Sequence, residues 1–128
     1  MTDCTVDGNE YEGVYSSSSN ASFTNCTINN NGSFGIYSGT SSTFEQCTIT
    51  NNGGTGIYAG GSSTFNLCSS SGNTVYGFYV VESGFFTNCI ANNNTIGGYY
   101  IGSYSSELIN CLAVDNDTTG LYLYDSST

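Results

Sequence analysis

Six cysteines are the residues of this sequence with the widest chemistry, because a thiolate can bind a metal, form a disulfide or attack a substrate. Intervals of 22, 21, 21, 21 and 22 residues separate them: Cys4, Cys26, Cys47, Cys68, Cys89 and Cys111. No C-x-x-C pair of the zinc-binding kind occurs among them, and the chain has no Lys, Arg or His to activate a thiol. The regular spacing indicates equivalent positions of a repeat, whose parallel side chains are poorly oriented for disulfides. We expect free thiols buried as small apolar residues.

The ten carboxylates are the second group that could do chemistry. Hydrolysis of a glycoside requires two carboxyl groups that face each other. Only Glu45 and Glu82 lie in the middle of the chain, at different positions of the repeat. The other acids belong to the first and last repeats: Asp3, Asp7, Glu10, Glu12, Glu107, Asp115, Asp117 and Asp125. We therefore expect no enzymatic activity.

The charge of the chain restricts its partners. Lys, Arg and His are absent and the formal net charge is −10, so nucleic acid is excluded as a partner because phosphate requires cationic side chains. No apolar run is long enough for a membrane span, and we expect no membrane insertion. The start of the chain lacks the basic region and apolar stretch of a secretory signal, which leaves a mature form, an excerpt or another export route. Neutral carbohydrate and divalent cations remain as partners.

Further columns of residues keep the register of the cysteines. Five residues after each cysteine stands an asparagine: Asn9, Asn31, Asn52, Asn73, Asn94 and Asn116. Nine after it stands a glycine: Gly13, Gly35, Gly56, Gly77, Gly98 and Gly120. Eleven after it stands a tyrosine: Tyr15, Tyr37, Tyr58, Tyr79, Tyr100 and Tyr122. Three before it stands a large apolar residue: Met1, Phe23, Phe44, Phe65, Phe86 and Leu108.

The short period predicts an all-β chain. Within one repeat Ile36 and Ser38 fall on one face of an extended segment and Tyr37 on the other. We expect left-handed backbone at the asparagine and glycine columns, which fall between such segments. A coil of three short strands, paired in parallel with the next coil about 4.8 Å away, fits this pattern. Six coils would give a rod of about 29 Å.

The repeat unit resembles that of a known fold. Residues 23–37 read F-x-x-C-T-I-x-N-N-G-x-x-G-I-Y, which resembles the right-handed parallel β-helix repeat of the pectate-lyase-like superfamily. The resemblance covers all six units and implies a right-handed parallel β-helix solenoid of six coils of 21–22 residues, a single domain over residues 1–128. It also implies that the asparagine column is a ladder of hydrogen-bonded amides.

Two segments resemble a second family. The segments 23–26, F-T-N-C, and 97–99, G-G-Y, are similar to the F-x-x-N and G-G-A-I repeats of chlamydial polymorphic outer-membrane adhesins. Cys26 stands where that family has Asn. Enzymes of the pectate-lyase-like superfamily use basic residues, and this chain departs from them by having none.

The tyrosine column allows two interpretations. The residue after each column glycine is expected to point inward, so each tyrosine points outward and six phenols form a strip along the rod. The strip either stabilises the sheet by stacking or forms a contact surface for a partner such as neutral carbohydrate.

Asparagine also gives sequons for N-glycosylation. They begin at Asn20, Asn25, Asn31, Asn93 and Asn116. Since Asn31 and Asn116 belong to the ladder, Asn20 and Asn93 are the predicted glycan sites.

The ends of the chain predict self-association. Neither end carries an evident cap, and the residues after Cys111 followed by the first four of a second copy restore a 21-residue interval. Ser126–Thr128 followed by Met1–Cys4 then parallels residues 41–47. We expect a non-catalytic structural subunit of a head-to-tail filament, extracellular or at the cell surface.

Acids would meet at such a junction. Asp117 would approach Glu10 of the next copy, and together with Asp7 and Asp115 these carboxylates could bind calcium. No other cofactor is expected. The alternatives are a surface adhesin, or a carbohydrate-binding β-helix segment excised from a larger protein. Ice binding is also open, but its threonine row is broken after Thr48 by Ser69, Ile90 and Leu112.

Overall fold

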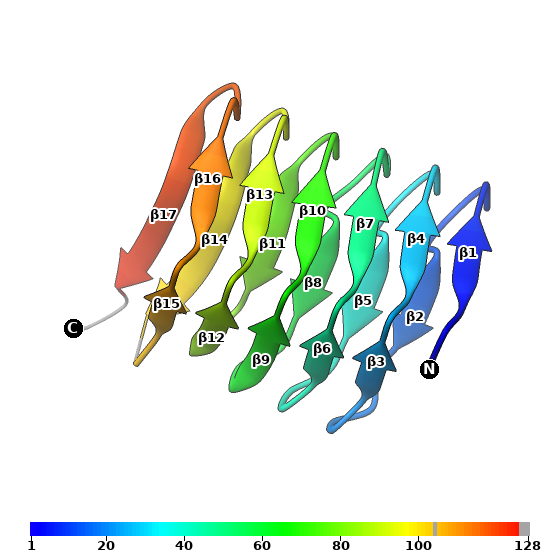
Figure 1. Ribbon diagram of the computed structural model, residues 1–128, viewed down its shortest axis with the longest axis horizontal. Coiled ribbons are helices and arrows are strands. Elements are labelled where there is room, and N and C mark those ends of the chain that lie inside the picture. Colours follow the sequence, from blue (N-terminus) through cyan, green and yellow to red (C-terminus); the bar gives the residue numbers. More distant parts are fainter. Residues whose placement is uncertain (104, 126–128) are drawn as a thin grey trace.

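The protein is a straight parallel β-solenoid (Figure 1). The structure, a computed structural model, describes residues 1–103 and 105–125, which form 17 strands and no helix. Each full coil places one strand in each of three parallel sheets, and the first and last coils form the two ends of the rod. The predicted all-β solenoid of six coils is confirmed.

The first sheet contains the strand that follows each cysteine (Figure 1, front). Its strands, in spatial order, are β1 (Thr5–Asp7), β4 (Thr27–Asn29), β7 (Thr48–Thr50), β10 (Ser69–Ser71), β13 (Ile90–Asn92) and β16 (Leu112–Val114). Thr5 pairs with Thr27 and Thr27 with Thr48, so the sequence interval between repeats equals the pairing interval.

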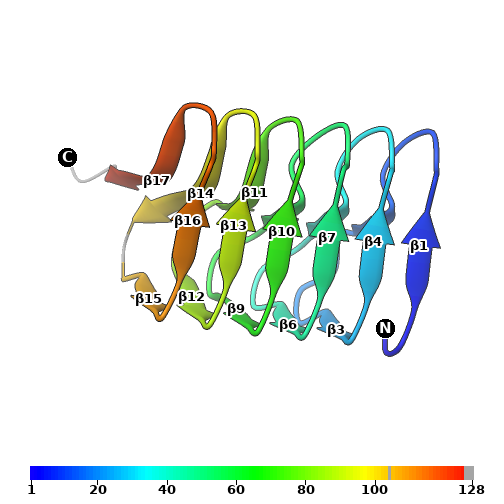
Figure 2. The ribbon, with the colours of Figure 1, turned by 45° about the horizontal axis from the view of Figure 1, so that its top comes forward.

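The second sheet carries the tyrosine column. Its strands lie behind those of the first sheet in Figure 2. Its strands, in spatial order, are β2 (Val14–Ser16), β5 (Ile36–Ser38), β8 (Ile57–Ala59), β11 (Tyr76–Val80), β14 (Gly97–Ser103) and β17 (Thr119–Asp125). Tyr15 pairs with Tyr37, and Tyr37 pairs with Tyr58. The strands lengthen from three to seven residues towards the last coil.

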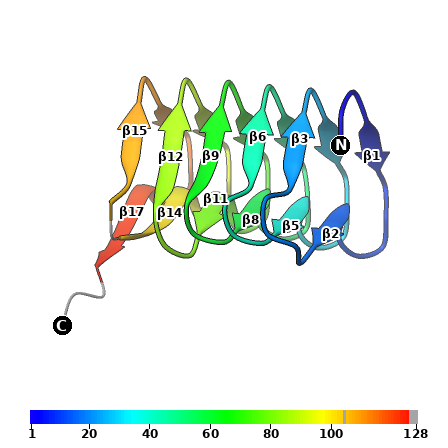
Figure 3. The same cartoon turned by 90° about the horizontal axis from the view of Figure 1, so that it is seen from below.

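The third sheet carries the phenylalanine column and faces the viewer in Figure 3. Its strands, in spatial order, are β3 (Ser22–Thr24), β6 (Thr43–Glu45), β9 (Ser63–Asn66), β12 (Gly84–Thr87) and β15 (Glu107–Ile109). In the first coil a single bridge between Thr2 and Thr24 takes the place of a strand.

The core is a stack of equivalent side chains. Phe23, Phe44, Phe65 and Phe86 stack with ring centroids 4.4–5.0 Å apart. The residues that follow the column glycines point inward as predicted, and from Ile36 to Tyr99 they are at most 1% exposed. In this column each of the four phenylalanine rings therefore packs on a ring of the same shape in the neighbouring coil.

Left-handed backbone occurs at different columns from those expected. Positive φ is found one residue before each cysteine, as at Asn25 (φ 50°), and one residue before each ladder asparagine, as at Asn30 (φ 54°). Neither the ladder asparagines nor the column glycines have positive φ in the described residues. The expectation was therefore wrong by one position for asparagine, whose neighbour makes the bend.

Space, rather than φ, requires glycine in the glycine column. A Cβ on Gly35 would lie 2.6 Å from the Gly56 carbonyl oxygen and 2.8 Å from Asn52 Nδ2. Both atoms belong to the next coil, and both already take part in coil-to-coil hydrogen bonds. The glycine column allows the backbone to pass beside the asparagine ladder.

Gly35→Ala should destabilise the fold by about 1–3 kcal/mol, the cost of overpacking a tight core. Gly8→Asn is the control, because Gly8 has positive φ with open space around it and Asn30 occupies the same position in the next coil. Thermal and urea unfolding compare the two variants with the parent chain. Equal stability of Gly35→Ala and the parent would contradict the steric explanation.

Candidate functional site

The asparagine column is a continuous hydrogen-bonded ladder. Nδ2 of each asparagine donates to Oδ1 of the asparagine in the next coil over 2.8–3.0 Å. The backbone N–H of the same residue donates to the same oxygen over 3.0–3.1 Å. The four inner side chains, from Asn31 to Asn94, are at most 2% exposed. The predicted ladder is confirmed, and it is satisfied internally without any charge.

The ladder has a direction. All five rungs donate from a coil to the one that follows it, so the two ends of the ladder differ. At the first coil, Oδ1 of Asn9 accepts no hydrogen bond from residues 1–103 and 105–125. At the last coil, Asn116 Nδ2 donates to the Ala91 carbonyl, and the Asn116 backbone N–H has no acceptor in that part of the chain. One end therefore offers an acceptor and the other end offers donors.

The cysteine column lies on the inner face of the rod. All six residues are free thiols, the inner four are buried, and Cys4 and Cys111 at the ends are half-buried. Each S–H donates to the carbonyl oxygen two residues earlier, as from Cys26 to Thr24 over 3.3 Å. Hydrogen bonds between neighbouring thiols raise the pKa of Cys68 and lower the pKa values of Cys47 and Cys89, that of Cys47 to about 7. The inner thiols are buried and pack like small apolar residues.

A thiol-modifying reagent such as Ellman's reagent should modify at most two cysteines of the folded protein, because only the end thiols are partly exposed. After unfolding in guanidinium chloride all six should react. In the control variant with Cys4→Ser and Cys111→Ser, the folded protein should give no signal. Rapid reaction of all six thiols in the folded state would contradict a buried column.

The tyrosine column forms a continuous stack of rings on the outside of the second sheet. Neighbouring ring centroids lie 4.3–5.0 Å apart with interplanar angles of 3–16° from Tyr15 to Tyr122. The rings point outward as predicted, with Tyr15 66% exposed at the first coil. Because each inner ring has a neighbour on both faces, only its edge and hydroxyl group face solvent.

This stacking leaves the inner tyrosine rings without a free face on which a sugar could pack. A sugar that packs on an aromatic side chain needs a free ring face, and the inner rings from Tyr37 to Tyr100 are covered by one another. The geometry thus favours the structural role of the column, since offset stacking stabilises neighbouring strands. Carbohydrate binding by the strip stays a prediction that would rely on the row of hydroxyl groups.

The ionisation of the strip should set an upper pH limit for stability. Burial, followed by the effect of Tyr100, raises the pKa of Tyr79 to about 12 from its ordinary value of 10.0. Because the folded state favours the neutral phenol, this contribution is full below pH 10 and is lost as the pH rises to about 12. Melting temperatures measured over this pH range should fall, and the fall should be smaller in Tyr79→Phe. Tyr11→Phe, outside the column, is the control and should behave as the parent; an unchanged fall in Tyr79→Phe would contradict the prediction.

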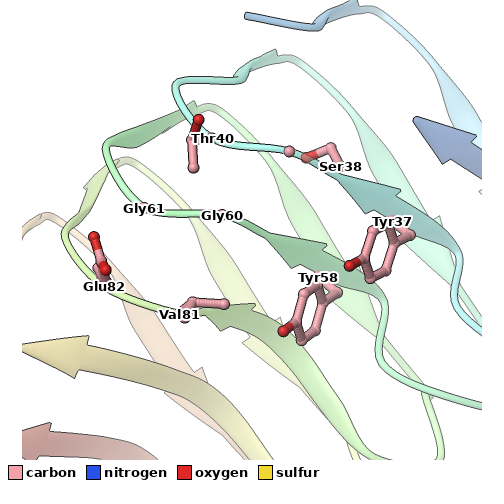
Figure 4. Close-up of a pocket in the computed structure, with 9 residues that line it drawn as sticks. Tyr37, Ser38, Thr40, Tyr58, Gly60, Gly61, Val81 and Glu82 are labelled. Carbon is pink, nitrogen blue, oxygen red and sulfur yellow. The ribbon is translucent and has the colours of Figure 1, made fainter. Parts of the chain in front are cut away.

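Two hollows flank the strip, and Tyr58 borders both. The first, of about 260 Å³, lies between Tyr37 and Tyr58 on one side and the turns that carry Thr40 and Glu82 on the other (Figure 4). Glu82 is its one charged side chain. The second, of about 360 Å³, lies on the other side of the strip between Phe34 and Tyr76.

The second hollow was missed in the sequence. Its two aromatic walls belong to a column eight residues after each cysteine, in which large and small residues alternate from Phe34 to Gly97: Glu12, Phe34, Thr55, Tyr76, Gly97 and Thr119. The residue type of this column is not constant, so the column does not stand out among the repeat columns of the sequence. The alternation itself was the available signal, since a small residue between two large ones leaves a gap in a stack.

The acids of the first coil accept hydrogen bonds from amides of the second coil. Asp3 accepts from Asn25 over 2.7 Å, and Asp7 accepts from Asn29 and Asn30 over 2.7 and 2.9 Å. In the middle of the rod Glu45 accepts from Asn66 in the same manner. These carboxylates therefore begin short polar columns of their own.

The residues predicted for calcium do not meet within one chain. Asp7 and Glu10 lie in the first coil, and Asp115 and Asp117 lie in the last coil at the other end of the rod. The described part of the chain contains no group of three or more His, Cys, Asp or Glu residues arranged to hold a metal. Calcium at a junction between copies stays a prediction, and the junction residues Ser126–Thr128 lie outside the described residues.

Both predicted glycan sites are exposed. Asn20 lies in a turn and Asn93 in a bend, and their φ values are 62° and 54°. Asn31 is 2% exposed and Asn116 is half-buried, as membership of the ladder predicts. Glycosylation of Asn20 and Asn93 stays a prediction. Residues 1–103 and 105–125 hold no helix that is long and apolar enough to cross a membrane.

A family comparison agrees with the ladders and the three parallel sheets. The sequence profile of the right-handed β-helix region family matches residues 1–69 and 36–128. The chain belongs to the right-handed β-helix region family. The predicted right-handed parallel β-helix is thus confirmed, including its hand. No curated protein matches the sequence. The β-helix fold itself carries no particular chemistry, since function depends on the sites built on a fold.

Proposed function

We propose that this β-helix is a non-catalytic structural protein whose copies stack head to tail into a filament, outside the cell or at its surface. The observation that supports the proposal is the direction of the asparagine ladder. The exposed Asn9 Oδ1 is an acceptor, whereas the Asn116 end of the ladder presents backbone and side-chain N–H groups. If two copies were placed end to end, Asn116 of one copy would donate to Asn9 Oδ1 of the next. This sixth rung would have the same donor and acceptor groups as the other five.

The apolar residues of the last coil support the same arrangement. Leu121 and Leu123 continue inward-pointing columns of β14, but they are 44% and 56% exposed, whereas Tyr99 and Ile101 before them are at most 1% exposed. A further coil in the same register would cover both side chains. Removing this apolar surface from water supplies the driving force, at about 25 cal/mol per Å².

The charged groups set the conditions for assembly. Asp115 and Asp117 of one copy would face Asp7 and Glu10 of the next, and carboxylates that approach each other repel unless a cation or a proton neutralises them. Stacking should therefore be promoted by calcium or by low pH. The structural role and the absence of catalysis fit a chain whose polar columns are occupied by hydrogen bonds between coils.

Asn116→Asp should abolish assembly without unfolding the chain. The new carboxylate can still accept from Asn94 but cannot donate to Asn9 of a second copy. Asn20→Asp is the matched control, because it adds the same charge at an exposed position outside the ladder. Negative-stain electron microscopy and light scattering at neutral pH should show filaments for the parent and Asn20→Asp, more with calcium than without it, and none for Asn116→Asp. Circular dichroism checks folding. Monodisperse parent monomers under every condition, or filaments of Asn116→Asp equal to those of the parent, would overturn the proposal.

A further inference from the structure

The hollow between Phe34 and Tyr76 is built from aromatic side chains on three sides. Phe34 and Tyr76 occupy equivalent positions two coils apart and form its walls. Tyr58 and Tyr79, stacked 5.0 Å apart, form one side of the hollow. Thr55, the small residue of the coil between the walls, leaves the space open together with Gly54. We call this feature the aromatic notch.

The walls of the notch differ from the tyrosine strip in how their rings are packed. The ring centroids of Phe34 and Tyr58 lie 5.5 Å apart, and the two ring planes make an angle of 54°. The ring centroids of Tyr76 and Tyr79 lie 5.9 Å apart, with an angle of 59° between the planes. Rings tilted in this way contact the strip by edge and face, and no aromatic residue is stacked in parallel on either wall in the described part of the chain. Both side chains are half-buried, so part of each ring faces the notch.

We propose that the aromatic notch binds a quaternary ammonium group, such as the head of choline or a trimethylated lysine. A cation is attracted by the negative faces of aromatic rings when it lies within about 6 Å of their centroids. Two equivalent positions two coils apart are separated by about 9.6 Å on the β-sheet spacing. A cation midway between the walls would then lie about 4.8 Å from each, within the range of both.

The charge of the protein favours a cation over other ligands. The chain carries a formal net charge of −10 and has no cationic side chain to compete for an aromatic face. Such a field raises the local concentration of cations and excludes anions. Glu12 stands one coil before Phe34 in the same column, which adds a negative charge on that side of the notch.

The polarity of the notch selects the kind of cation. Its lining is mainly apolar, with the Thr55 side chain and tyrosine hydroxyls as the side-chain polar groups. A primary ammonium keeps three N–H donors that each require an acceptor, whereas a quaternary ammonium has none and loses little on leaving water. A sugar ring would bring several hydroxyl groups to a surface with few partners. The notch therefore fits a methylated cation better than lysine or a neutral sugar.

The proposal can be tested by titrating the whole protein with choline chloride while following its aromatic side-chain NMR signals. The neutral carbon isostere 3,3-dimethylbutan-1-ol and methyl glucoside are titrated in parallel. Choline should bind more tightly than both, and its affinity should fall as NaCl is added, because screening weakens the attraction. Signals of Phe34 and Tyr76 should shift first.

Variants of the walls separate aromatic attraction from simple packing. Phe34→Leu and Tyr76→Leu keep an apolar side chain but remove a ring, and each should weaken choline binding by about fivefold. Tyr15→Leu is the control, because Tyr15 is aromatic and exposed but lies outside the notch, and its affinity should equal that of the parent. Equal binding of choline and its isostere, tighter binding of the sugar, no binding of choline, or unchanged affinity in both wall variants would each overturn the proposal. None of these readouts depends on filament formation.

Discussion

In-register pairing of identical side chains is the interaction on which the rest of this structure depends. A coil of about 21 residues has no core of its own, so it becomes ordered only when its backbone and its columns meet the same groups in the next coil. Asparagine satisfies this condition because one side chain carries both a donor and an acceptor, and Asn52 can therefore bond Asn31 and Asn73 at once. Phenylalanine, tyrosine and cysteine satisfy it by packing on themselves. Each of these columns therefore consists of a residue type that can bond to, or pack on, a second copy of itself.

This requirement also explains the unusual composition. A charged residue repeated in register would face its own sign about every 4.8 Å along a sheet, and the repulsion would oppose pairing. Uncharged polar residues avoid that cost, which is consistent with a chain that is only 8% charged. Where acids do occur next to the columns, as at Asp7 and Glu45, they face amide donors of the next coil instead of other acids. The acidic residues thus fit into the stack at positions where the neighbour can donate.

Most of the fold could be predicted from the sequence, because a period of 21–22 fixes which residues pair. The columns of Cys, Asn, Phe and Tyr were placed correctly, and so was the inward direction of residues such as Ile36 and Ile57. The left-handed positions were placed one residue late at Asn31 and Asn52, since the residue that bends and the residue that bonds are adjacent and both are asparagine. The aromatic notch depends on the tilt of Phe34 and Tyr76, which arises from the space above Thr55 and Gly97 and has no signature in any single repeat.

The direction of the ladder also gives the rod an electrical polarity. Backbone hydrogen bonds between coils run both ways, as from Thr48 to Cys26 and from Asn25 to Glu45, so their dipoles largely cancel. The five side-chain rungs all run one way, and aligned amide dipoles add, as they do along an α-helix. The Asn116 end is then the positive pole, where Asp115 and Asp117 lie beside it as compensating charges. The Asn9 end is the negative pole of the ladder, so two ladders attract each other when opposite ends meet and repel each other when like ends meet.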